Sequence, residues 1–114
     1  MPPLTGEQAG ELAAALDPAW DLGEGELRRT LRLRDFNAAL GLAVRIGLIA
    51  EDQGHHPDLD VGWGRLGIRL TTHAIGGLST NDFVMAAKID RLLARGLGLR
   101  EDGSAVPGSS GPSA

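Results

Sequence analysis

The three histidines of this chain, His55, His56 and His73, all fall within one short segment. Imidazole titrates near neutral pH, so one ring can donate a proton while another accepts one. Carboxylates lie near the segment, and Glu51 stands one helical turn before His55. We expect these side chains to form a polar cluster capable of acid/base chemistry.

Three interpretations of the histidines compete. They can be surface or capping residues at the ends of secondary-structure elements, with no chemical role. They can be zinc ligands, because three imidazoles and a water form a known catalytic set, although adjacent histidines make poor joint ligands and the helical i, i+4 pair is absent. They can also act as metal-free acids and bases. Their confinement to one window beside carboxylates favours this third interpretation, and we expect no metal.

Periodicity and turn residues predict the elements that must position the histidines. Thr5 and Gln8 form a capping-box pattern, Asp35 can cap a long helix that Gly54 ends, and Gly64 can make a hairpin turn. The predicted order is helix 5–16, hairpin 19–35, helix 35–54, hairpin 58–73 and helix 81–96. This order indicates an α+β fold, in which an antiparallel sheet of two β-hairpins has helices packed on one face.

The adjacent histidines lie where the long helix passes into the second hairpin. Pro57 biases His56 toward an extended backbone, on which successive side chains point to opposite faces. Both imidazoles therefore face one cavity only if the backbone kinks at this junction. His73 lies in a strand-like run at the far end of the second hairpin. If the sheet folds back, His73 can come near the start of the first strand of that hairpin.

The long helix is apolar on two sides, and a helix of this kind must be covered on both. One sheet covers a single side, so the second of the two apolar stripes indicates a contact between subunits. The two stripes are Phe36, Leu40, Ala43 and Val44, and Ala38, Leu42, Ile46 and Ile49.

Size and composition limit the remaining possibilities. The 114 residues predict one domain, over 1–100, followed by a disordered Gly/Ser/Pro tail over 101–114. The absence of cysteine excludes thiol chemistry and disulfides, and the net charge of −4 argues against nucleic acid as a partner. The arginines of 26–35 are interpreted as a solvated strand face. We expect a cytoplasmic protein without a membrane partner, because the sequence shows neither a signal peptide at its start nor an apolar run of about 20 residues.

The spacing of these residues resembles the signature of pterin-4a-carbinolamine dehydratases. The matching positions are Glu51, His55, His56, Pro57, Trp63, His73 and Asp82. The flanking segment 70–90 is also similar to that family, and the resemblance covers roughly residues 4–97. After Pro57 the family often has Glu-Trp-Phe, whereas this chain has 58-DLD-60, which changes the pocket wall but none of the imidazoles.

The resemblance implies a reaction and roles for the residues. Members of the family dehydrate 4a-hydroxy-tetrahydropterin, left by hydroxylases that use tetrahydrobiopterin, to quinonoid dihydropterin, and they consume no metal or cofactor. By position, the pterin site is His55, His56 and His73, with His56 or His73 as the acid and His55 binding substrate or taking the ring proton. Glu51 then orients an imidazole. Asp82 stabilises a helix start or supports the site.

The family resemblance also implies the assembly and a rival function. Members are commonly tetramers joined partly through the long helix, so we expect a homodimer or homotetramer through helix 35–53. Pro57 and Trp63 are expected to line the substrate pocket, with the core as the other place for Trp63. Some relatives instead act as dimerisation cofactors of a transcription factor or in Rubisco assembly. Such a binding or assembly role is the alternative, although it does not require three histidines.

Overall fold

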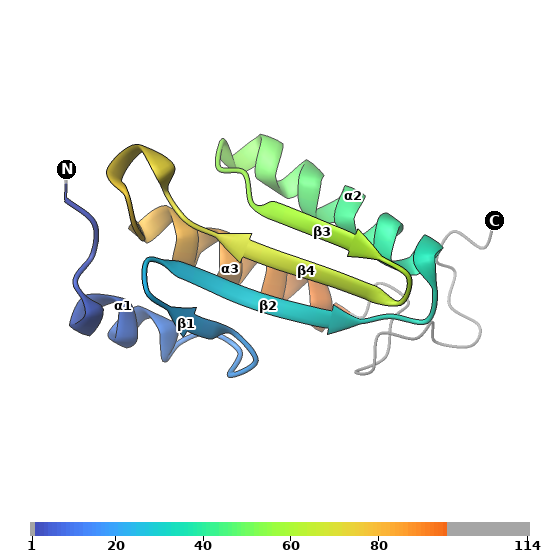
Figure 1. The fold of residues 1–114 in the computed structure, drawn as a ribbon, viewed down its shortest axis with the longest axis horizontal. Helices are drawn as coiled ribbons and strands as arrows, with labels where there is room; N and C mark the ends of the chain where they lie inside the picture. Colours follow the sequence, from blue (N-terminus) through green and yellow to red (C-terminus); the bar gives the residue numbers. More distant parts are fainter. Residues whose placement is uncertain (1, 96–114) are drawn as a thin grey trace.

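Two β-hairpins alternate with three α-helices over residues 2–95, the part of the chain that the computed structural model describes (Figure 1). The elements are α1 (Gly6–Ala13), β1 (Asp21–Gly23), β2 (Glu26–Arg32), α2 (Phe36–Gln53), β3 (Asp58–Gly62), β4 (Arg65–Leu70), the short 3₁₀ helix η1 (His73–Ile75) and α3 (Thr80–Ala94). The order confirms the predicted one. The tail predicted over 101–114 lies outside the described residues.

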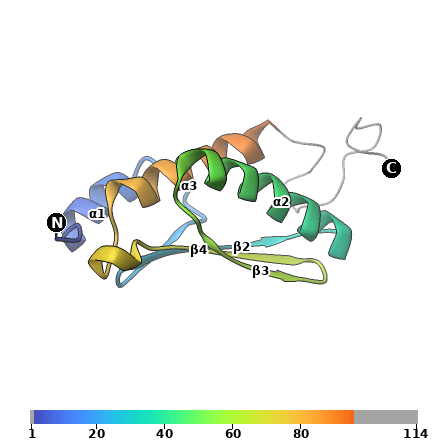
Figure 2. The same ribbon diagram turned by 90° about the horizontal axis from the view of Figure 1, so that it is seen from above.

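The four strands form one antiparallel sheet in the order β1-β2-β4-β3, so the two hairpins join through their second strands. Each hairpin turns at a glycine with positive φ, Gly25 at 75° and Gly64 at 68°. Figure 2 shows α2 and α3 lying against the same face of the sheet. The predicted α+β class, with helices packed on one face, is confirmed.

Local signals define most helix ends. Thr5 and Gln8 form the capping box at the start of α1, Asp35 caps α2 by accepting from the Ala38 amide at 2.8 Å, and Gly54 ends α2 at φ 69°. Helix α1 ends at Ala13, earlier than predicted, because the last turn tightens: the amide of Leu16 bonds to the carbonyl of Ala13. This tight turn changes the direction of the chain before Pro18. The Trp20 side chain, a few residues later, is buried in the core.

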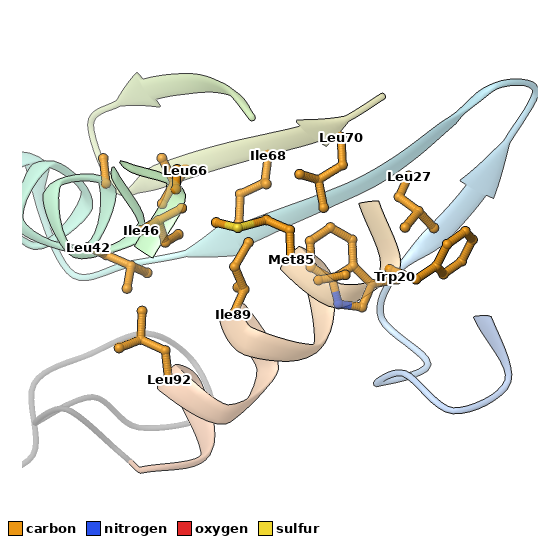
Figure 3. Packing of buried hydrophobic residues seen from close by; sticks show 14 of the residues in the cluster. Trp20, Leu27, Leu42, Ile46, Leu66, Ile68, Leu70, Met85, Ile89 and Leu92 are labelled. Atoms are coloured by element: carbon orange, nitrogen blue, oxygen red, sulfur yellow. The ribbon is translucent and has the colours of Figure 1, made fainter. Parts of the chain in front are cut away.

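The core lies between the sheet and the helices. Figure 3 shows Met85 and Ile89 of α3 facing Ile68 of β4, while Ile46 of α2 packs farther along the same strand. All four side chains are fully buried. Burial of a large aliphatic side chain contributes about 1.5–3 kcal/mol, so this layer is the main source of stability for the fold.

Only one side of α2 is covered in the single chain. Leu42 and Ile46 are buried against the sheet. On the other side an apolar stripe is exposed, made of Phe36, Leu40, Val44 and Leu48. The assignment of the subunit contact to the second stripe is therefore wrong, because Leu42 and Ile46 of that stripe pack on the sheet. The exposed side is the first stripe, with Ala43 buried and Leu48 added to it. A subunit contact on this stripe stays a prediction.

One charged side chain of β2 points inward rather than outward. Arg29 donates from Nη1 to Asp90 Oδ1 of α3 at 2.9 Å, and the Trp20 indole donates to the same oxygen at 2.7 Å. The amide of Asp17 donates to the other carboxylate oxygen of Asp90 at 2.9 Å. This cluster joins the segment after α1 to the sheet and to α3. It was missed because Arg29 was grouped with the solvated arginines of its strand.

None of the helices within residues 2–95 combines the length and apolarity needed to cross a lipid bilayer.

Candidate functional site

The three predicted histidines lie at one end of the sheet, where α2 ends, β3 begins and β4 is followed by η1 (Figure 1). His55 and His56 lie between the end of α2 and the start of β3, and His73 opens η1 just after β4. The prediction that His73 lies on a strand is wrong. Strand β4 stops at Leu70, because Thr72 leaves the ladder and pairs with Gly77 in an isolated bridge that closes the loop.

His55 is turned into the protein and binds the buried carboxylate of Asp82. Its Nε2 lies 2.5 Å from Asp82 Oδ1, and the exposed fractions of the two side chains are 13% and 0%. Asp82 also accepts from the Ser79 amide through Oδ2 at 2.9 Å, at the N-terminus of α3. One oxygen of Asp82 thus meets the start of α3 and the other meets an imidazole, and its role in the site stays a prediction.

Two hydroxyl groups complete the surroundings of Asp82. The Thr72 hydroxyl donates to Asp82 Oδ2 at 2.7 Å, and the hydroxyls of Thr72 and Ser79 are 2.7 Å apart. Sequence reasoning missed both residues as part of the site. Thr72 stands directly before His73, but only the folded loop shows that it faces the carboxylate.

His56 points away from His55 and pairs with a different carboxylate. Its Nε2 lies 2.6 Å from Glu51 Oε1, and both side chains are largely exposed. The contact agrees with the expected role of Glu51 in orienting an imidazole. The two adjacent histidines thus bind different carboxylates, in keeping with the alternation of side chains on an extended backbone.

His73 lies beside the start of β3, as the folded-back sheet predicted. Its Nε2 is 3.9 Å from Asp58 Oδ2, and both side chains are exposed. Asp58 was noted only as a departure from the family pattern. Each histidine thus has its own carboxylate at this end of the sheet.

The three imidazole–carboxylate pairs have a geometry that suits proton transfer. A carboxylate beside an imidazole orients the ring, determines its tautomer and stabilises its cation. Within residues 2–95, no group of three or more His, Asp or Glu side chains has the geometry to hold a metal ion. The arrangement can deliver a proton from one ring and accept one at another.

Trp63 is placed away from the histidines. It occupies the β3–β4 turn, at the opposite end of the strands, and its exposed fraction is 76%. The prediction of a core position is wrong, because β3 ends at Gly62 and its alternation does not extend into the turn. Pro57 follows the histidine pair at the start of β3. The pocket roles of Pro57 and Trp63 stay predictions.

A cavity of about 610 Å³ opens beside the loop that follows His73. It is lined by residues 3–6, 22–25 and 76–78, together with Ala9. The volume is typical of small-molecule pockets. None of the three histidines lines it, so the cavity and the imidazole pairs are separate features of the single chain.

Comparisons with known proteins agree on one family. The family profile described as Pterin 4 alpha carbinolamine dehydratase matches residues 2–92. A provisionally named pterin-4-alpha-carbinolamine dehydratase of Rubrobacter xylanophilus is 50% identical over 93 residues, covering 81% of this chain and 86% of that protein. Its counterpart in Methylococcus capsulatus is 45% identical over 96 residues, covering 82% and 83%.

Solved structures show the same fold. The crystal structure of a transcriptional coactivator/pterin dehydratase from Brucella melitensis superposes with a TM-score of 0.72 at 30% identity, covering 79% of this chain and 97% of that one. A pterin dehydratase-like protein identified as a RuBisCO assembly factor in the alpha-carboxysome gives a TM-score of 0.54 at 18% identity, covering 65% and 88%. The second likeness concerns the fold alone.

Proposed function

Since the chain belongs to the pterin-4a-carbinolamine dehydratase family, we propose that it dehydrates 4a-hydroxy-tetrahydropterin to quinonoid dihydropterin and water. The observation that carries the proposal is the set of three histidines at one end of the sheet, each beside its own carboxylate. A fold retained only for binding has no need of three such pairs.

The reaction requires two proton transfers and no co-reactant. A proton is delivered to the 4a-hydroxyl, the bond between C4a and this oxygen breaks, and water leaves. A proton is then lost from N5 as the double bond between N5 and C4a forms. One proton is supplied and one recovered, so imidazoles alone can complete the cycle.

The hydrogen bonds support different roles for the histidines. A carboxylate only accepts, so the bond from His55 to Asp82 requires the proton of a neutral His55 ring to be on Nε2, which leaves the lone pair of Nδ1 free. His55 is therefore proposed as the base that takes the N5 proton. With His55 proposed as the base, the more exposed His56 and His73, beside Glu51 and Asp58, are the candidates for the acid.

We further propose the setting of this activity. The substrate is the product of a tetrahydrobiopterin-dependent hydroxylase, so the reaction serves tetrahydrobiopterin recycling in the cytoplasm. The exposed stripe on α2 is the proposed contact of a homodimer or homotetramer. Neither nucleic acid nor membrane is a proposed partner.

The test is spectrophotometric. Purified protein is mixed with freshly generated 4a-hydroxy-tetrahydropterin, and dehydration is followed with and without a chelator. Acceleration that survives the chelator and is lost in His55→Gln, His56→Gln or His73→Gln supports metal-free imidazole catalysis. Asp58→Asn should also lower the rate. Its matched control is Asp60→Asn, because Asp60 lies on the same strand but pairs with Arg65.

The alternative is a binding or assembly role without catalysis. It is kept because the same fold occurs in the carboxysomal assembly factor. The histidine variants separate the two functions, since they should abolish dehydration and leave an assembly function intact. A well-folded wild-type protein that does not accelerate dehydration would overturn the enzyme proposal in favour of a protein partner.

A further inference from the structure

A chain of hydrogen bonds leads from Ser79 to His55, and the donor and the acceptor of each bond can be assigned. As a carboxylate, Asp82 accepts all of its bonds. Thr72 has a single hydroxyl proton, and it donates this proton to Asp82 Oδ2 at 2.7 Å. The hydroxyl of Thr72 must therefore accept from the hydroxyl of Ser79, which lies 2.7 Å away. The order runs from Ser79 through Thr72 to Asp82, which in turn accepts from His55.

The orientation of Asp82 depends on the bonds to its Oδ2 atom. One comes from the backbone amide of Ser79 at 2.9 Å, and the other from the Thr72 hydroxyl. A single donor can hold an oxygen while the carboxylate plane still rotates, whereas two donors from different segments limit that rotation. Because Asp82 is fully buried, no solvent is available to replace a lost donor.

We propose that Thr72 is a positioning residue of the site, whose hydroxyl holds Asp82 so that His55 keeps its proton on Nε2 and its lone pair on Nδ1. Within residues 2–95 the Thr72 hydroxyl makes no hydrogen bond to an imidazole, so it acts through Asp82. The positioning itself is a property of the folded chain. Its consequence for rate rests on the proposed dehydratase function.

The experiment compares Thr72→Val with Thr72→Ser. Valine keeps the shape and removes the hydroxyl, whereas serine keeps the hydroxyl. The first readout is the tautomer of neutral His55, from long-range ¹H–¹⁵N spectra of labelled protein, with the three histidines assigned through His56→Gln and His73→Gln. The second readout is the kcat of dehydration, separated from KM.

The matched control is Thr71→Val. The neighbouring Thr71 hydroxyl donates to the Gly25 carbonyl at 2.7 Å, so this variant also loses one hydroxyl bond at the end of β4 but none to the site. We expect Thr72→Val to lower kcat by roughly 10- to 100-fold, the range for one hydrogen bond to a charged group, and to mix the two His55 tautomers. Thr72→Ser and Thr71→Val should keep the wild-type tautomer and kcat.

An unchanged His55 tautomer in folded Thr72→Val would overturn the proposal, and so would an equal effect of Thr71→Val. If Thr72→Val does not fold, Thr72→Ala removes the same donor to Asp82 Oδ2 with a smaller side chain and should mix the two His55 tautomers in the same way. A wild-type protein without dehydratase activity would remove the proposed function alone. The tautomer spectra would still decide whether Thr72 positions the ring.

Discussion

Replacement of Asp90 by alanine should destabilise the fold by several kcal/mol, although Asp90 takes no part in the proposed chemistry. Asp90 accepts bonds from the side chains of Arg29 and Trp20 and from the backbone of Asp17. The exposed fractions of the Arg29 and Asp90 side chains are 11% and 19%, so water cannot easily replace the lost partner.

The loss of unfolding free energy is estimated from the Arg29 guanidinium, which Asp90→Ala leaves buried without its main partner. Removing one member of a buried ion pair costs about 3–5 kcal/mol, because the remaining charge stays buried. Asp17 lies 3.7 Å from Arg29 Nη2 and compensates in part, which places Asp90→Ala near about 3–4 kcal/mol. The whole stability of such a domain is about 5–15 kcal/mol, so the variant should remain folded with a much smaller margin.

A double-mutant cycle isolates the ion pair. In an Arg29→Met background the buried guanidinium is already absent, together with its Nε atom, which has no hydrogen-bond partner among residues 2–95. Asp90→Ala then loses only the bonds from Trp20 and Asp17, and should cost about 1–2 kcal/mol. We therefore expect a coupling energy of about 2 kcal/mol between the two sites.

The assay is urea unfolding followed by far-ultraviolet circular dichroism, at one fixed protein concentration because an oligomer would stabilise the fold by mass action. Asp60→Ala is the control. It breaks a shorter arginine–aspartate contact, 2.6 Å to Arg65, but both side chains are exposed, so the cost should stay below about 1 kcal/mol. Equal costs for Asp90→Ala and Asp60→Ala would refute the reasoning that burial, rather than distance, determines the energy.

Three further predictions concern the site, the assembly and a turn. Glu51→Gln should lower the dehydration rate and change the free energy of unfolding by less than about 0.5 kcal/mol, because its pair with His56 is exposed; kinetics and urea unfolding check both. Leu40→Glu should yield a smaller species in light scattering if the α2 stripe is a subunit contact, and an unchanged mass would contradict that contact. Gly64→Ala should cost about 1–3 kcal/mol in urea unfolding, since φ is 68° and a Cβ would lie 3.0 Å from a backbone carbonyl. Gly76→Ala, at φ 69° with open space around it, should cost less.

The features that depend on neighbouring residues were predictable from the sequence. The capping box of Thr5 and Gln8 and the cap at Asp35 use partners within one turn of helix. The glycines that end α2 and turn the second hairpin supply a positive φ that other residues adopt at a cost. These local signals were enough for the order of elements and the α+β class. The spacing of the histidines and carboxylates also pointed to the family.

The partners of the functional side chains were decided by the tertiary structure. Asp82 reaches His55 across 27 residues, and Asp90 reaches Arg29 across 61. Arg29 occupies an inward position on β2 that alternation alone assigns to an apolar side chain, and its acceptor comes from α3. Trp63 fits the alternation of β3 but lies beyond the last paired residue, so it is exposed.

The same distinction applies within the site. Its residue types and positions are properties of the sequence, because imidazole and carboxylate chemistry belongs to the side chains themselves. The assignment of Asp82 to His55, Glu51 to His56 and Asp58 to His73 required the end of α2, the start of β3 and the loop after β4 to meet. Which group donates a proton in a hydrogen bond, and which group accepts it, depends on the partner that each side chain meets. In this site the partners are determined by packing between segments that are distant in the chain.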